Sequence, residues 1–520
     1  MPGPALTAAL RATTPEVLRA AGAHDALVIG SGAAGGLAAL LLADAGLRVL
    51  VLEAGWARPR TGSHQLGSDI LDALRQRQPI QSLCYAWSFD PEAFVDDIDC
   101  CYLTPPSHPF VWLRARQVGG RMVVPGHGRQ YYRLAPNDLV AADGMSPSWP
   151  LRPHELDRWY SFVERRLKLS GMHDRVPWLP DSEISNLLNP TPVEATFQRA
   201  ITARWSGARP VLGRFAPPLD ALEAAAQSGC LLIRTGAIAR EIEVDSLGRV
   251  QGVVWIDQRT RREERARARL VFLCASALES TRLLLLSRSG RSPYGLGAAS
   301  GVLGRYLMDH VCVKAEGRGP QPQQVAQGRC LYLPRFDARE FSVPRMERGF
   351  GVQLHQIPAD GQRSDFYAVS FAEMLPQPEN RVSLDAEQRD AWGIPVLRIN
   401  CTHGAREIKR AVEQIAALRQ LAELLSVTLT KIDDAPEPPG TSAHESGTAR
   451  MGYSPESSVL GPYNQCWEAQ GLYVTDGACF PSQGSQNPTL TILALTARAC
   501  DHALRTGAVM SPSSRKAVEA

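Results

Sequence analysis

The sequence predicts an α/β protein of mixed α+β type, in which a Rossmann-like nucleotide-binding domain is joined to a discontinuous sheet-plus-helix domain. Two observations at opposite ends of the chain support this prediction. The first is an apolar strand followed by a glycine-rich turn at residues 26–36. The second is a pair of polar motifs at residues 444–452 and 476–488. Together they indicate one site that is built from both ends of the chain.

The N-terminal unit has the pattern of a dinucleotide-binding turn. Residues 26–29 are apolar, as expected of a buried parallel strand. Gly30 permits a tight turn, Gly32 lets the backbone approach a pyrophosphate, and Gly35 allows a helix to pack closely on the strand. The helix that follows is predicted to end at residues 45–46.

An acidic residue completes this unit. The next predicted strand, residues 48–52, is followed by Glu53, at the distance from the glycines where a carboxylate accepts the ribose hydroxyls. The acid favours FAD or NAD over NADP, because it would repel a 2′-phosphate. A chance run of glycines is the alternative interpretation, and the complete strand–helix–strand unit argues against it.

Composition excludes several other classes of protein. The chain has 520 residues, 44% of them hydrophobic, and a net charge of +3, which fits two joined domains of one enzyme. The basic stretch 259–265 contains glutamates and predicts an exposed hairpin rather than a nucleic-acid site. The eleven cysteines include no Cys-x-x-Cys pair. We therefore expect no metal site and reduced thiols in a cytoplasmic protein, with no export signal and no membrane span.

The middle of the chain carries no nucleotide-binding signal, so we expect it to bind substrate. Residues 317–328 predict an exposed loop. A helix beyond it should place Ile408, Val412, Ile415, Leu418 and Leu425 on one face. The expected nucleotide-binding domain comprises residues 22–140, 224–315 and 455–508. The expected substrate-binding domain comprises 141–223 and 316–454, with an N-terminal extension of 1–21 and a disordered tail of 509–520.

These features resemble the glucose–methanol–choline (GMC) family of flavoprotein oxidoreductases. The resemblance covers nearly the whole chain: the N-terminal fingerprint, residues 114–120, 274–280 and 304–310, and the two C-terminal motifs. A shorter stretch, 380–385, resembles the sugar- and gluconate-oxidising branch and is also compatible with an ordinary strand. The resemblance implies FAD and oxidation of an alcohol carbon of a sugar, polyol or other alcohol. Substrate, oligomeric state and electron acceptor, either oxygen or an external carrier, stay open.

The resemblance also implies a catalytic pair, His444 and Asn487. Hydride leaves a carbinol carbon for flavin N5 when the hydroxyl proton is removed, and a neutral imidazole can accept that proton. An amide cannot act as the base, but it can hold the alcohol oxygen in place. The alternatives are a structural role for His444 and helix capping by Asn487, since Asn before Pro488 is a good N-cap.

The expected cofactor contacts also follow from the resemblance. Asp476 and Gly477 would meet the ribityl chain and pyrophosphate, and the backbone of Ala237 the adenine. The helix after Pro488 would direct its positive N-terminus at the flavin and stabilise the anionic reduced form. The full expected set is Gly30, Ser31, Gly32, Ala34, Gly35, Glu53, Arg114, Gly119, Gly120, Ala237, Asp476, Gly477, Pro488 and Thr489.

Two features depart from the family pattern. No tryptophan follows Gly119 and Gly120, and the nearest histidine is displaced to His127; Ser276 stands where glycine is common. Members with a histidyl–flavin link carry the histidine at the position of Val124, so we expect non-covalent FAD. A lyase-type or redox-inactive flavoprotein of the same fold is the alternative function.

Overall fold

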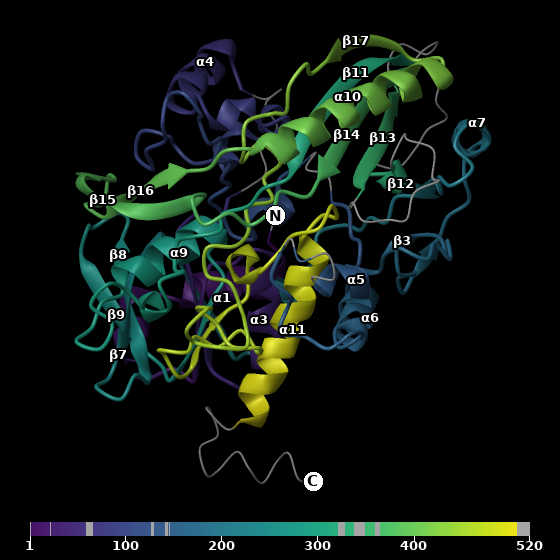
Figure 1. The fold of residues 1–520 in the computed structure, drawn as a ribbon. Helices are drawn as coiled ribbons and strands as arrows, with labels where there is room; N and C mark the ends of the chain where they lie inside the picture. Colours follow the sequence, from purple (N-terminus) through teal and green to yellow (C-terminus); the bar gives the residue numbers. More distant parts are fainter. Residues whose placement is uncertain are drawn as a thin grey trace.

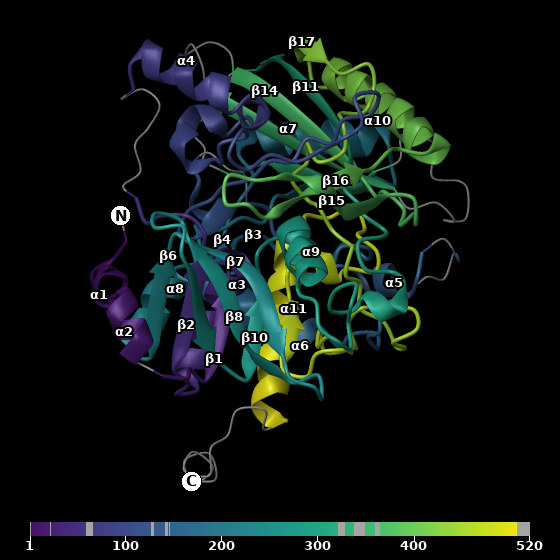
Figure 2. The same cartoon turned by 90° about the vertical axis from the view of Figure 1, so that its left-hand side faces the viewer.

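The computed structural model describes residues 2–20, 22–58, 66–125, 129–140, 144, 146–320, 328–336, 349–358 and 364–506. The protein has two halves, seen as the lower and upper parts of Figures 1 and 2. The lower half contains a five-stranded sheet and the upper half a six-stranded sheet. This arrangement confirms the predicted mixed α/β fold.

The five-stranded sheet is parallel and uses both ends of the chain. Its order is β18-β10-β1-β2-β6. All residues of its four strands other than β6 are buried, as expected of a parallel sheet covered on both faces. The strands are β1 (Ala26–Ile29), β2 (Val49–Glu53), β6 (Leu231–Thr235), β10 (Leu270–Leu273) and β18 (Leu472–Val474).

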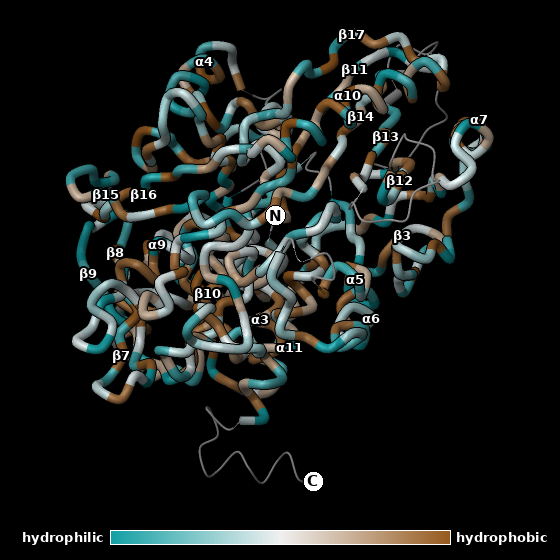
Figure 3. Tube along the Cα trace, in the orientation of Figure 1, coloured by the Kyte–Doolittle hydropathy of each residue, from teal (hydrophilic) through white to brown (hydrophobic). Residues whose placement is uncertain are grey.

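Helices pack against this sheet and against one another. Helix α3 (Ala33–Asp44) begins directly after the glycine-rich turn and contacts α8 (Ala221–Gln227) and α11 (Thr489–Arg505). Helix α11 also contacts α6 (Asp157–Leu167), where the Tyr160 hydroxyl lies 2.9 Å from that of Thr491. Figure 3 shows hydrophobic residues gathered in the interior around α3 and α11.

The domain bounds given above stay a prediction.

Smaller elements complete the two halves. A three-stranded antiparallel sheet lies beside α9 (Ala277–Leu286), and its hairpin at residues 259–265 is exposed, as predicted. Its strands are β7 (Ala237–Val244), β8 (Val250–Asp257) and β9 (Glu263–Arg267). Other helices and strands outside the two large sheets are α1 (Pro4–Ala12), α2 (Pro15–Ala20), α4 (Ser68–Arg77), α5 (Pro136–Leu139), α7 (Pro192–Arg204), β3 (Ser170–Gly171), β4 (Asn186–Leu187), β15 (Arg381–Arg389) and β16 (Pro395–Asn400).

The six-stranded sheet is antiparallel, and helix α10 (Ala405–Leu424) crosses one of its faces in Figure 1. Its order is β17-β11-β14-β13-β12-β5. The strands are β5 (Val211–Leu212), β11 (Val311–Gly319), β12 (Leu331–Phe336), β13 (Phe350–Pro358), β14 (Ser364–Ala372) and β17 (Thr428–Ile432). In the part of the chain that the structure describes, no helix has both the length and the apolar character needed to cross a membrane.

Helix α10 is confirmed, and its predicted apolar face is correct in part, because the last three residues of the predicted set pack in the core but the first two are exposed. Ile408 and Val412 are 45% and 62% exposed, whereas Glu407 and Gln414 are buried. The Glu407 carboxylate accepts hydrogen bonds from the backbone of residues 375 and 404, and the Gln414 amide donates to Val311 and Ser370. Hydrophobic periodicity cannot anticipate polar side chains whose burial is compensated by such bonds.

The loop predicted at residues 317–328 begins later than expected. Gly317 to Gly319 belong to β11, because they still pair with Ser364 to Phe366 of β14. Residues 321–327 lie outside the described residues.

Candidate active site

One cavity brings together residues from both ends of the chain. It is lined by the turn at residues 29–34, by Glu53, by residues 443–445 and by the segment that starts α11. The predicted residues that line it are Gly30, Ser31, Gly32, Ala34, Glu53, Arg114, Gly120, Ala237, His444, Asp476, Gly477, Asn487, Pro488 and Thr489. Gly119 lines an adjoining pocket, and Gly35 lines neither.

The glycine-rich turn fits a bound pyrophosphate. Gly30 has a φ of 91°, and a Cβ there would lie 2.5 Å from the carbonyl oxygen of Cys274. A Cβ on Gly35 would lie 1.9 Å from the Gly30 carbonyl oxygen, so this glycine serves helix–strand packing. A Cβ on Gly32 would have no other atom within 4 Å. Gly32 lies on the wall of the cavity, at the N-terminus of α3. An anion can therefore approach the backbone there.

Glu53 is buried, and its carboxylate connects the glycine-rich turn to the turn that follows β2. One carboxylate oxygen accepts hydrogen bonds from the Ser31 amide at 3.0 Å and the Ser31 hydroxyl at 2.6 Å, and the other accepts from the Gly55 amide at 2.7 Å. The Ser31 hydroxyl in turn accepts from the Gly119 amide at 3.0 Å. Burial raises the pKa of Glu53, against the effect of its hydrogen bonds. The carboxylate thus holds the shape of the glycine-rich turn, and its role toward ribose stays a prediction.

Asp476 is hydrogen-bonded to other residues of the cavity wall and its surroundings. Its carboxylate accepts a hydrogen bond from the Ala478 amide at 3.0 Å and another from the Ser280 hydroxyl on α9. Burial raises the pKa of this group to about 6. The nearby Ser276 adopts φ 77° and ψ 150°, a conformation almost restricted to glycine. Ser276, which replaces the family's common glycine, is a small residue, but its backbone is strained in this conformation.

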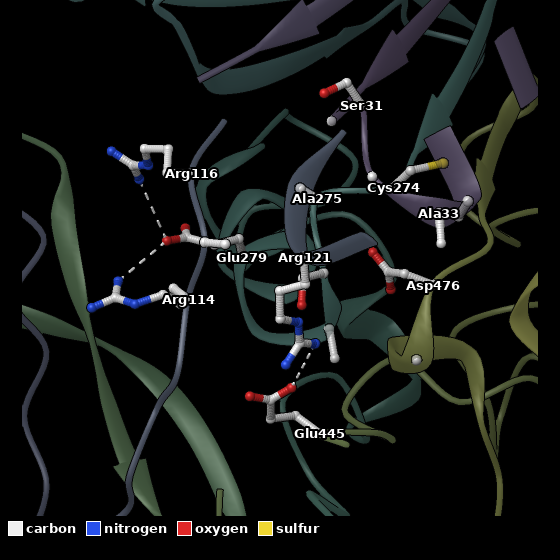
Figure 4. Close-up of a pocket in the computed structure, with 18 of the residues that line it drawn as sticks. Ser31, Ala33, Arg114, Arg116, Arg121, Cys274, Ala275, Glu279, Glu445 and Asp476 are labelled. Atoms are coloured by element: carbon white, nitrogen blue, oxygen red, sulfur yellow. Dashed lines mark hydrogen bonds and ion pairs between the residues drawn. The ribbon is translucent and has the colours of Figure 1, made fainter. Parts of the chain in front are cut away.

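Charged side chains other than the predicted Arg114 also line the cavity. Figure 4 shows Arg114 and Arg116 on either side of the Glu279 carboxylate, at 3.6 and 3.8 Å. Burial acts to raise the pKa of Glu279, but the neighbouring arginines lower it below its usual range. Arg121 points toward Glu445 at 3.3 Å in the same view. The cavity therefore carries several cationic groups suited to a phosphate-containing ligand.

His444 and Asn487 lie together where this cavity meets a larger one. The Asn487 amide nitrogen is 3.3 Å from His444 Nε2, and the Asn487 amide oxygen accepts a hydrogen bond from Gln353 at 2.8 Å. The capping interpretation of Asn487 fits its position but not its side-chain contacts. The backbone of Pro488 is already helical, which leaves Asn487 at the start of α11, but the Asn487 side chain bonds to Gln353 and His444 and makes no capping bond to α11. The Asn487 side chain is consequently turned toward the histidine.

A second histidine, missed as a site residue by the sequence analysis, contacts the first. His310 Nδ1 lies 2.9 Å from His444 Nδ1, and His310 Nε2 lies 3.1 Å from the carbonyl oxygen of Gly484. The neighbouring Asp309 accepts hydrogen bonds from the backbone amides of Gly440 at 2.7 Å and His444 at 3.2 Å. The stretch 304–310 carried part of the family resemblance, but nothing in its sequence placed it beside His444.

The larger cavity has a volume of about 970 Å³ and contains His444 and Asn487 in its wall. Its floor includes alternating residues of the antiparallel sheet, among them Lys314, Gln353, His355 and Phe371. Its other side includes three exposed apolar residues, Leu83, Tyr85 and Phe89. The cavity can therefore accommodate a ligand with both polar and apolar parts.

Two further expectations concern covalent attachment of the flavin and binding of a metal ion. His127 lies outside the described residues, and the buried Val124 occupies the position of the histidyl link, so non-covalent FAD stays a prediction. Within the described residues, no group of three or more His, Cys, Asp or Glu side chains is arranged to hold a metal ion.

Comparison with known proteins indicates the same family as the sequence motifs. A sequence profile of GMC oxidoreductases matches residues 376–496, and one of FAD-binding domains matches residues 25–76. The chain is 27% identical to 2-methyl-1,2-propanediol dehydrogenase of Mycolicibacterium austroafricanum, over 92% of this chain and 95% of that protein. It is 28% identical to paromamine 6'-oxidase of Streptomyces fradiae, over 92% of this chain and 90% of that protein. Its fold is similar to that of pyridoxine 4-oxidase from Mesorbium loti, with a TM-score of 0.61 and 18% identity over 92% and 99% of the two chains.

Proposed function

This chain belongs to the GMC oxidoreductase family of FAD-dependent enzymes, and on that premise we propose that it oxidises a CH–OH group of a sugar, polyol or related alcohol, with His444 as the base. The observation that carries the proposal is the position of His444 and Asn487. Both side chains line the cavity of the glycine-rich turn and the larger cavity beside it. An alcohol in the larger cavity would therefore meet them at the boundary with the cofactor.

The proposed chemistry divides the two hydrogens of the carbinol between two acceptors. FAD, when bound, accepts the hydride that leaves the carbon. His444 Nε2 accepts the hydroxyl proton, and the Asn487 amide donates a hydrogen bond to the alcohol oxygen as the C=O bond forms. Gln353 holds the Asn487 amide in the required orientation, because it donates to the amide oxygen at 2.8 Å.

The larger cavity supports a hydroxylated substrate bigger than a simple alcohol. Its volume, about 970 Å³, is at the upper end of the roughly 300–1,000 Å³ typical of small-molecule sites. Gln353, His355 and Lys314 offer polar contacts on its floor. Two relatives are named for a diol and for oxidation at a 6' position. With the stretch 380–385, these features favour the sugar- and gluconate-oxidising branch of the family.

The proposal is tested by anaerobic reduction of the enzyme-bound flavin. Purified holoenzyme is mixed under nitrogen with single sugars, polyols and simple secondary alcohols, and the loss of yellow colour is followed. At least one sugar or polyol should bleach the flavin faster than any simple alcohol. Conversion of an alcohol without bleaching would instead favour the lyase-type alternative.

Asn487 provides the first prediction from this arrangement. Asn487→Ala should slow flavin reduction by about 10-fold or more, on the scale of a lost hydrogen bond to the reacting oxygen. Asn487→His should retain more activity, because an imidazole N–H can also donate a hydrogen bond to the alcohol oxygen. Stopped-flow reduction rates and melting temperatures of both variants check this. A variant with a lower melting temperature and an unchanged rate would contradict the orienting role.

The proposal includes a cytoplasmic location. Its support is that all eleven cysteines of the chain lie within the described residues as free thiols, nine of them buried. The electron acceptor in this proposal would be oxygen or an external carrier.

A further inference from the structure

We propose that His310 is a positioning residue for the base: it holds His444 in the tautomer that carries its proton on Nδ1, so that Nε2 can accept a proton from the substrate. This inference rests on the proposed role of His444. It follows from a chain of four hydrogen bonds whose direction is fixed at one end.

The fixed end is the carbonyl oxygen of Gly484. A carbonyl oxygen can only accept a hydrogen bond, so His310 Nε2, at 3.1 Å, must carry a proton and donate it. His310 is 1% exposed, and burial lowers its pKa to about 4, so the ring is neutral near pH 7. A neutral imidazole carries a single ring proton. His310 Nδ1 therefore has a lone pair and can only accept.

This lone pair determines the protonation of His444. The two Nδ1 atoms are 2.9 Å apart, so His444 must donate from its Nδ1 to that of His310. A neutral His444 then has its lone pair on Nε2. The opposite tautomer would set two lone pairs against each other at this distance, in a site closed to compensating solvent on the His310 side.

The other end of the chain is consistent with this assignment. Gln353 donates to the Asn487 amide oxygen at 2.8 Å, which leaves the Asn487 NH₂ group directed at His444 Nε2, 3.3 Å away. All four bonds therefore run in the same direction, from Gln353 through Asn487, His444 and His310 to Gly484. Such chains strengthen each member bond by polarisation.

Packing keeps the two imidazoles in this relation. The His310 and His444 rings meet edge to face with centroids 4.9 Å apart, and the Phe371 ring lies 5.2 Å from each. Asp309 holds the backbone of His444 through the amide at 3.2 Å. One dipeptide of the chain thus fixes both the backbone and the ring of the base.

The inference is tested with two variants of similar size. His310→Asn keeps an acceptor, because the amide oxygen takes about the place of Nδ1. His310→Leu fills the space and accepts nothing. The ring ¹⁵N resonances of His444 are recorded in holoenzyme labelled with ring-¹⁵N histidine and assigned by their absence in His444→Gln. We expect the Nδ1–H form in the wild type and in His310→Asn, and a measurable population of the Nε2–H form in His310→Leu, where only the Asn487 amide still favours the original tautomer.

Rates give an independent readout. His310→Leu should reduce its flavin about 10²-fold or more slowly at saturating alcohol, with little change in KM, since a wrong imidazole tautomer costs about 10⁴-fold in a serine-protease triad. His310→Asn should recover most of that loss. An Nε2–H form of His444 in the wild type would overturn the inference whether or not the variants fold. An unchanged tautomer and rate in His310→Leu would overturn it too, while a normal rate in His444→Ala would overturn the proposed function itself.

Discussion

Replacing His444 by alanine is expected to slow flavin reduction by about 10²–10⁴-fold while the protein keeps its FAD, the range for loss of a general base. The imidazole lies where the cofactor cavity meets the larger cavity, within 3.3 Å of the Asn487 amide. The backbone of His444 stays bound to Asp309 in the variant, so the loop keeps its path. Single-turnover reduction under nitrogen and the flavin-to-protein absorbance ratio measure the two quantities.

His502 is a matched control for this experiment. It is a partly buried histidine on α11 that stacks on Tyr463 at 4.2 Å and is absent from the wall of either cavity. His502→Ala should therefore reduce its flavin at the wild-type rate, even with a lower melting temperature. Wild-type reduction in His444→Ala would show that another group removes the proton.

Glu53→Ala is expected to weaken FAD binding by about 10–100-fold, which corresponds to loss of a hydrogen bond to a charged group. The free energy of unfolding of the apoprotein should also fall by about 1–3 kcal/mol, because the Ser31 and Gly55 donors lose their buried acceptor. Once saturated with FAD, the variant should show a near-normal reduction rate. Titration of apoprotein with FAD and chemical unfolding measure the two effects.

Glu164 separates the effect on the cofactor from the effect on stability. It is a fully buried carboxylate, paired with Arg133 at 2.9 Å and absent from the cofactor cavity. Glu164→Ala should therefore lower the free energy of unfolding without changing FAD affinity. Full flavin affinity in Glu53→Ala would contradict the cofactor role of Glu53, and NAD binding in place of FAD would contradict the cofactor assignment.

The features that sequence predicted well are those encoded by neighbouring residues. The first strand, the turn at Gly30 and Gly32, helix α3 and strand β2 follow from local hydrophobic pattern and glycine spacing. The proximity of this turn to His444 and Asn487 was expected, because both sets of residues match motifs of the same family. The structure places these residues along a common cavity.

The features that sequence missed depend on contacts between distant segments. His310 and His444 are 134 residues apart, and Gln353 and Asn487 are also 134 residues apart. Their pairing exists only once the antiparallel sheet packs against the C-terminal loops. The buried polar residues of α10 were missed for the same reason, since the partners of Glu407 and Gln414 belong to other segments. Capping by Asn487 was a sound local expectation that a tertiary contact overrides.

The order of strands in the parallel sheet affects how the protein matures during synthesis. Strand β10 pairs on one side with β1 and on the other with β18, whose first residue is Leu472. At about 5–20 residues per second, roughly 10–40 seconds pass between synthesis of β10 and of β18. Until then β10 has an unpaired edge, and the wall that contains Asp476 and Asn487 has not been made. The complete cofactor site can therefore form only after the segment with Asn487 has been made, and until then the edge of β10 is open to association with another strand.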